Sequence, residues 1–107
     1  MTDWDDAFDN VGYISDAPGY IDLWQSRAAA FRRDARGELA VPYGSGERQK
    51  LDIFRPDGDA KGLAVFVHGG YWTKLDRSFF SDLAAGPLAH GLAVAVPSYT
   101  LAPQASI

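Results

Sequence analysis

Cysteine is absent from this sequence, and histidine occurs only twice, as His68 and His90. Without cysteine there is no disulfide scaffold, no thiolate zinc site and no cysteine nucleophile. Two isolated histidines make a poor metal site. The aspartates near the N-terminus lack the central glycine and closing glutamate of a calcium loop. We therefore expect no metal and no cofactor, and the composition fits a reducing compartment.

Long apolar runs and a basic surface are also missing. No purely apolar run is longer than that of residues 63–67, which is far too short to cross a bilayer. The start MTDWDD has neither the positive region nor the apolar segment of a signal peptide. The net charge is −4, and five of the 14 acidic residues lie within residues 1–16. With no basic patch, we expect a soluble cytoplasmic protein without a nucleic-acid or membrane partner.

The first third of the chain predicts an N-terminal arm followed by a helix. Residues 1–15 are acidic, carry spaced aromatics and predict at most one short helical turn. Apolar residues then recur at intervals of three and four, which places them on one helical face; they are Ile21, Trp24, Ala28, Phe31 and Ala35. Ser15 or Asp16 can cap this helix, Pro18 suits its first turn, and Gly37 can end it. Its last turn holds three cations favoured by the helix dipole, Arg32, Arg33 and Arg36.

The remaining chain predicts an antiparallel hairpin and one parallel βαβ unit. Residues 38–55 read as two short strands around the Gly-Ser-Gly turn at 44–46. The apolar run 63–67 predicts a strand covered on both faces, residues 76–91 a helix kinked or interrupted at Pro87, and residues 92–97 a second buried strand. The fold class is therefore α/β, and we divide the chain into 1–37 and 38–107.

The sequence His68-Gly69-Gly70-Tyr71-Trp72 stands at the carboxyl end of the first parallel strand, where open α/β sheets bind ligands. Two glycines permit positive φ angles and let another group approach the backbone closely. The simplest interpretation is a tight turn whose glycines serve geometry alone. However, an HGG run after an apolar strand is also the oxyanion-hole motif of lipases and esterases.

Three stretches extend this similarity: LDIFRP (51–56), AVFVHGGYW (64–72) and GLAVAVPSYTLAP (91–103). Together they resemble the N-terminal part of an α/β-hydrolase, in the branch related to hormone-sensitive lipase that includes the kynurenine formamidases (arylformamidases). FDNVGYI (8–14) loosely resembles the arm of that family, whereas Gln104 stands where the family has glutamate after LAP.

The resemblance implies a role for each residue of the turn. The backbone N–H groups of Gly70 and Tyr71 become oxyanion donors, and Gly69 gives access to them. Trp72 lines the substrate pocket or packs at its rim. His68 comes too early in the chain to be the catalytic base, so we expect it to hold the turn through a hydrogen bond. His90 is expected to be structural or solvent-facing.

The nucleophile, acid and base of a serine hydrolase are not found in this chain. There is no G-x-S-x-G; Ser45 lies in a hairpin turn, and Ser98 follows a proline without flanking glycines. We expect the N-terminal segment of a hydrolase of small amides or esters, arylformamidase being the best single candidate, with a missing C-terminal part or complementary chain as partner. The alternative is an inactive truncated or split chain that acts as an interaction module. A phosphate cradle at a helix N-terminus is a third, weaker interpretation, because no Lys, Ser or Thr directly follows the glycines.

The missing nucleophile strand has a structural consequence. In α/β-hydrolases that strand pairs with the strand preceding the HGG turn, here residues 63–67. We therefore expect residues 63–67 to form an exposed apolar edge through which the chain can associate with itself.

Overall fold

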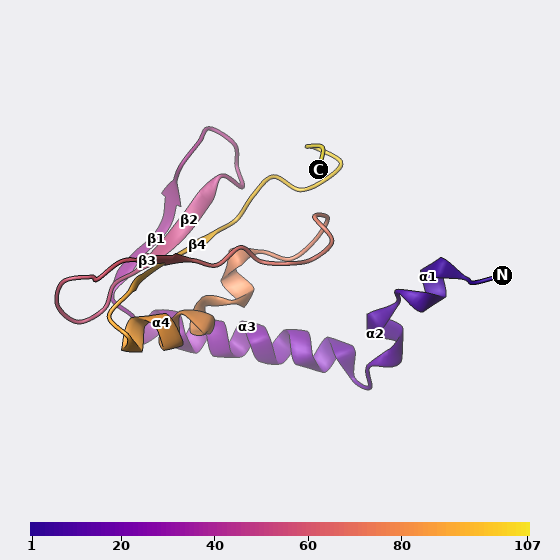
Figure 1. The fold of residues 1–107 in the computed structure, drawn as a ribbon, viewed down its shortest axis with the longest axis horizontal. Coiled ribbons are helices and arrows are strands. Elements are labelled where there is room, and N and C mark those ends of the chain that lie inside the picture. Colours follow the sequence, from indigo (N-terminus) through magenta and orange to yellow (C-terminus); the bar gives the residue numbers. More distant parts are fainter.

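Four strands form one mixed sheet in the computed structural model, which describes residues 1–107 (Figure 1). The strands are β1 (Gly37–Pro42), β2 (Lys50–Phe54), β3 (Leu63–Val65) and β4 (Ala93–Pro97). Their order across the sheet is β1-β2-β4-β3. β1 pairs antiparallel with β2, β2 antiparallel with β4, and β3 parallel with β4. The predicted hairpin and parallel βαβ connection are thus confirmed.

The principal helix, α3 (Ala17–Asp34), lies across one face of the sheet (Figure 1). Pro18 lies in its first turn, as predicted, and Asp16 occupies the N-cap position, but its side chain makes no capping hydrogen bond because its backbone is left-handed, with a φ of 56°. The predicted end at Gly37 is wrong, because the backbone is already extended at Ala35, and Gly37 begins β1. Arg36 therefore lies beyond the helix and not in its last turn.

The core lies between α3 and the covered face of the sheet. Its fully buried members are Phe54, Ala84, Val94 and Val96. The ring of Phe31 meets that of Phe54 edge-on at 5.3 Å, an arrangement worth about 0.5–1.5 kcal/mol beyond area burial. Only 12 of the 107 residues are buried, so this core is small for the length of the chain.

The prediction of a helix over 76–91, kinked or interrupted at Pro87, is wrong in its first half. The segment folds instead as two 3₁₀ turns, η1 (Arg77–Phe79) and η2 (Ser81–Ala84), followed by the short α4 (Ala85–Ala89). Two physical reasons explain the break. The carbonyl of Ser78 accepts a 2.7 Å hydrogen bond from Arg32 of α3 instead of a helical N–H. Pro87 has no backbone N–H, so it cannot donate the hydrogen bond that a helix beginning near residue 77 would need there. It occupies the first turn of α4, where that N–H is not required.

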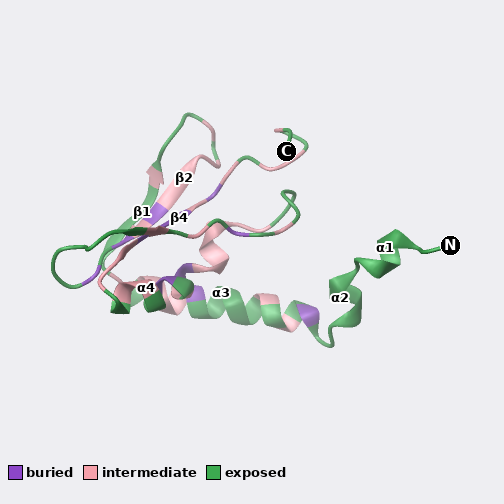
Figure 2. Ribbon diagram, in the orientation of Figure 1, coloured by how far each residue is buried: buried purple, intermediate pink, exposed green.

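The expectation that residues 63–67 are covered on both faces is also wrong. Ala64 and Phe66 pack toward the core, but Leu63, Val65 and Val67 are about 60% exposed (62%, 58% and 61%). The helices lie against one face of the sheet (Figure 2), so the residues of β3 that face the other way, Leu63 and Val65, stay exposed while Ala64 is half-buried. As expected, β3 is an edge strand of the sheet.

The acidic arm forms two short helices, where at most one was expected: α1 (Trp4–Ala7) and α2 (Asn10–Tyr13). The side chain of Asp3 caps α1, and that of Asp9 caps α2. The arm projects away from the sheet (Figure 1), which gives a radius of gyration of 16.0 Å where about 13 Å is usual for this length. None of the helices combines the length and apolarity needed to cross a membrane. The division at residue 37 stays a prediction.

Candidate functional site

Phe66 and Val67 connect β3 to the glycine turn, which is built from left-handed backbone. Gly70, Tyr71 and Trp72 have φ angles of 128°, 53° and 58°. The carbonyl of Gly70 accepts from the N–H groups of Thr73 and Lys74 at 3.1 and 3.2 Å, which closes the turn. A Cβ at position 70 would collide with the carbonyl oxygen of Lys74. Gly70 is therefore required both by its dihedral angle and by the lack of space around it.

Gly69 differs, because a Cβ added there would meet no atom within 4 Å. The space beside this residue is open. In addition, none of the backbone N–H groups of residues 69–72 donates a hydrogen bond within the chain. The N–H groups of Gly70 and Tyr71 are thus available to a ligand acceptor, which is the property an oxyanion hole needs. Their catalytic role stays a prediction.

His68 is buried, at 2% exposure, and stacks on the rings of Tyr99 and Phe80 with centroid distances of 4.5 and 5.9 Å. Its Nδ1 lies 2.7 Å from the carbonyl oxygen of Gly69. Because a carbonyl only accepts, Nδ1 carries the proton in this contact, and the buried Nε2 has no partner. This geometry suits the expected role of His68 in holding the turn. His90 follows α4 and is exposed.

Two hydrogen bonds join the glycine turn to the YTLAP segment. The hydroxyl of Tyr99 donates to the carbonyl of His68 at 2.7 Å, and the N–H of Ala102 donates to the carbonyl of Trp72 at 2.8 Å. The two motifs on which the resemblance rests are therefore one structural unit. Sequence reasoning found both motifs but not their contact, because the pairing spans about 30 residues.

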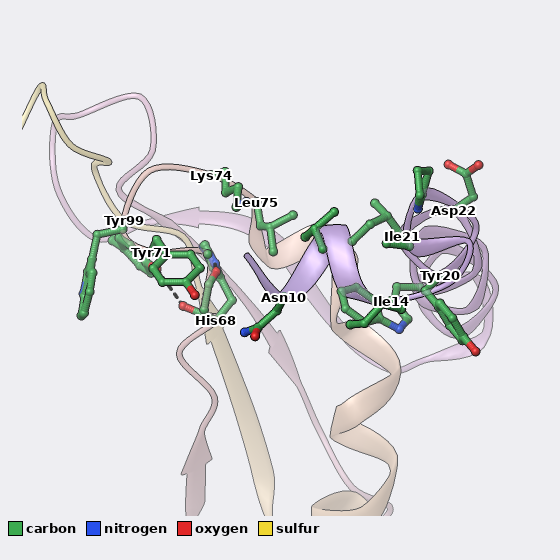
Figure 3. A pocket seen from close by; sticks show the side chains of 17 residues that line it. Asn10, Ile14, Tyr20, Ile21, Asp22, His68, Tyr71, Lys74, Leu75 and Tyr99 are labelled. Atoms are coloured by element: carbon green, nitrogen blue, oxygen red, sulfur yellow. Dashed lines mark hydrogen bonds between the residues drawn. The ribbon is translucent and has the colours of Figure 1, made fainter. Parts of the chain in front are cut away.

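A hollow of about 1150 Å³ opens beside the turn, between it and the helices α2 and α3. In Figure 3, His68, Tyr71 and Tyr99 stand on one side, and Ile14, Tyr20 and Ile21 on the other. Trp72, 55% exposed, lines this hollow and also a smaller one of about 340 Å³. Sequence reasoning missed the wall formed by the arm and α3. The one signal in the sequence for this wall was the set of apolar residues spaced along the arm and along α3.

A buried charged network supports the segment after the turn, and sequence reasoning missed it as well. Asp52, at 3% exposure, accepts a 2.9 Å bond from Nε of Arg77. Arg77 also donates to Oγ of the fully buried Ser98, which in turn donates to Asp76. Ser98 is therefore committed to structural bonds.

The pKa of Asp76, which belongs to this network, is lowered. Burial opposes its ionisation, but hydrogen bonds from Ser98 and Ser78 and the charge of Arg77 outweigh that effect. Together they hold the pKa of Asp76 below its ordinary value of 3.8.

The sheet order and the glycine turn after β3 define a partial α/β-hydrolase fold. A crystal structure from Silicibacter sp. TM1040, of a protein provisionally assigned as a thioesterase, superimposes with a TM-score of 0.92. The two sequences are 46% identical, and the match covers 98% of this chain and 41% of the Silicibacter protein. Esterase B from Lactobacillus rhamnosis gives a TM-score of 0.58 at 20% identity over 83% of this chain and 32% of its own, which shows the fold alone.

At the level of sequence, the chain is similar to kynurenine formamidases. It is 39% identical over 72 residues to the protein of Salmo salar, a match that covers 64% of this chain and 24% of that protein. The protein of Drosophila melanogaster is 39% identical over 67 residues, covering 61% of this chain and 22% of its own length. The match thus spans about a quarter of these relatives. No family model matches the chain.

Proposed function

We propose that this chain supplies the oxyanion hole and part of the substrate pocket of a serine hydrolase of small amides or esters. Arylformamidase is the best single candidate. The observation that carries the proposal is the pair of adjacent N–H groups, on Gly70 and Tyr71, that lack an acceptor beside a largely apolar hollow. The similarity to proteins named kynurenine formamidase supports cleavage of a small amide.

The reaction is acyl transfer through a covalent intermediate. A serine attacks the substrate carbonyl, and the resulting oxyanion accepts hydrogen bonds from the two N–H groups. Each fixed donor of this kind contributes about 10²–10³ in kcat. The scissile carbonyl enters over Gly69, where the space is open, and the rest of the substrate lies against Trp72 and the hollow.

The nucleophile and base come from residues outside these 107. Ser98 is buried and hydrogen-bonded to two charged side chains. His68 is buried and its Nδ1 donates to the carbonyl of Gly69, so we do not assign it the activation of a serine. Both observations agree with the absence of a G-x-S-x-G motif in the sequence.

The test is to isolate from the native source the polypeptide or complex that contains this sequence. It is then treated with a fluorophosphonate probe and assayed with an N-formyl arylamine, such as N-formylkynurenine, and with a simple aryl ester. We expect a labelled serine outside residues 1–107 and hydrolysis of at least one substrate. A species that is neither labelled nor active would overturn the proposal.

The exposed edge favours a second candidate, an inactive chain that acts as an interaction module. Leu63, Val65 and Val67 present apolar side chains on a strand with one unpaired edge, which is a template for another strand. This function predicts association without serine labelling, so the same experiment separates the two candidates.

A further inference from the structure

The loop between β1 and β2 is closed by Gln49. Its side-chain carbonyl accepts from the N–H of Gly46 at 2.8 Å, and its own N–H donates to the carbonyl of Gly46 at 3.0 Å. A Cβ at Gly44 or Gly46 would collide with the Gln49 side chain. The glycines of this loop therefore let the backbone fold tightly over Gln49. The neighbouring residue, Arg48, extends from the loop to Leu75, which follows the glycine turn, and to Tyr99, which contacts the beginning of that turn.

The guanidinium of Arg48 bridges these two segments. Its Nε donates to the carbonyl of Tyr99 at 2.9 Å, and its Nη2 donates to the carbonyl of Leu75 at 2.8 Å. Nη2 also lies 3.5 Å from Oδ1 of Asp76. The side chain is only 32% exposed, so these bonds are partly shielded from water. One side chain thus connects residues that are 27 and 51 positions away along the chain.

Both acceptors control the geometry of the turn. Tyr99 stacks on His68 and donates to its carbonyl, so fixing the Tyr99 backbone fixes the beginning of the turn. Leu75 follows Lys74, whose N–H closes the turn on Gly70. Leu75 itself has a φ of 71°, a strained conformation that persists only where the surroundings enforce it. Arg48 holds that carbonyl in place.

We propose that Arg48 is a positioning residue for the oxyanion turn. It holds the entry and the exit of residues 68–75 at a fixed separation, so that the N–H groups of Gly70 and Tyr71 keep one direction. This role rests on the proposed function. It requires arginine rather than lysine, because a planar fork reaches two carbonyls at once and a single ammonium does not.

The test compares Arg48→Ala, Arg48→Lys and the control Arg55→Ala in the active polypeptide or complex. Arg55 forms an exposed ion pair with Glu38. We expect Arg48→Ala to lower kcat about a hundredfold with little change in KM, since a displacement of about 1 Å has that effect. Arg48→Lys should lose nearly as much although it keeps the charge, and added guanidinium should partly restore Arg48→Ala. An unchanged kcat in Arg48→Ala, or full activity in Arg48→Lys, would overturn the role.

A second measurement separates this proposal from the proposed function. If the wild-type protein hydrolyses nothing, the proposed function fails, and the backbone amide resonances of Gly69, Gly70 and Tyr71 are followed by NMR in the same protein. Positioning by Arg48 predicts that Arg48→Lys shifts these resonances while Arg55→Ala leaves them in place. Unmoved resonances in Arg48→Lys would refute the role of Arg48 whatever the activity. Arg48→Lys, which keeps the charge beside Asp76, serves here in case Arg48→Ala does not fold.

Discussion

At the scale of single residues, two glycines provide a matched pair. A Cβ added at Gly69 or at Gly86 would meet nothing within 4 Å, and neither residue has a positive φ. We expect Gly69→Ala to fold with a free energy of unfolding within about 0.5 kcal/mol of the wild type. Its methyl group occupies the space proposed for the substrate carbonyl, so kcat/KM should fall about a hundredfold.

Gly86→Ala is the control, because Gly86 lies in α4, far in the sequence from the turn. Alanine there favours the helix by up to about 1 kcal/mol and should leave activity unchanged. Thermal unfolding measures the stability of both variants, and steady-state kinetics measures their kcat/KM. Equal activity in the two would mean that the substrate does not approach Gly69.

Asp76 gives a prediction on pH. Because its folded pKa is lowered, the ionised carboxylate stabilises the fold above its ordinary, unfolded pKa of 3.8. That contribution disappears as the pH falls through the lower, folded pKa. We therefore expect Asp76→Asn to lower the Tm at pH 7, and the difference from wild type to shrink as the pH falls below the ordinary pKa of 3.8.

Asp59→Asn is the matched control, since Asp59 is exposed in a loop and forms no hydrogen bond or ion pair. Its Tm should follow the wild type at every pH. A Tm difference in Asp76→Asn that stays constant from neutral to acid pH would show that the carboxylate contributes nothing through its charge.

At the scale of elements, Arg32 joins α3 to the segment 77–84. Its Nη1 donates at 2.7 Å both to the carbonyl of Ser78 and to Oγ of the fully buried Ser81. We expect Arg32→Ala to lower the free energy of unfolding by about 1.5–3 kcal/mol, the range for hydrogen bonds to a charged group. Urea unfolding measures this change.

Arg33 is the natural control, because it lies in the same last turn of α3, is exposed and forms no such bond. Arg33→Ala loses the same favourable interaction with the helix dipole and should change stability by about 0.5 kcal/mol or less. If the two variants lose equal stability, Arg32 stabilises the fold through the helix dipole and not through its hydrogen bonds to Ser78 and Ser81.

The elements that the sequence predicted correctly are those whose signal is local. The apolar face of α3 follows from residue spacing and agrees with the burial of Ala28. The break in 76–91 could not be read in the same way, because it depends on Arg32, about 46 residues away. Arg48 was missed for the same reason.

The candidate site shows the same division. The glycine turn was visible in the sequence, since a left-handed φ at Gly70 and its contact with Lys74 leave little choice of residue. The wall of the hollow was not visible, because it needs α2 and α3 to be placed beside the turn. An apolar run alone also could not show that β3 is covered on one face only.

At the scale of the whole molecule, the two edges of the sheet differ. β1 is interrupted by an irregularity between Glu38 and Val41, where Ala40 has a φ of 55°, and it ends at Pro42. These features discourage pairing with a further strand. β3 has no such protection and exposes Val65 at 58%. The molecule therefore has one protected edge and one edge open to association.

We expect the isolated chain to associate in a concentration-dependent manner through β3, and Val65→Lys to shift it toward the monomer, because an edge lysine opposes strand pairing. Leu39→Lys, on β1 and 52% exposed in the wild type, adds the same charge at the opposite edge and should leave association unchanged. Sedimentation velocity over a range of concentrations measures all three proteins. A monomeric wild type at every concentration would contradict association, and equal effects of the two lysines would point to net charge rather than to the β3 edge.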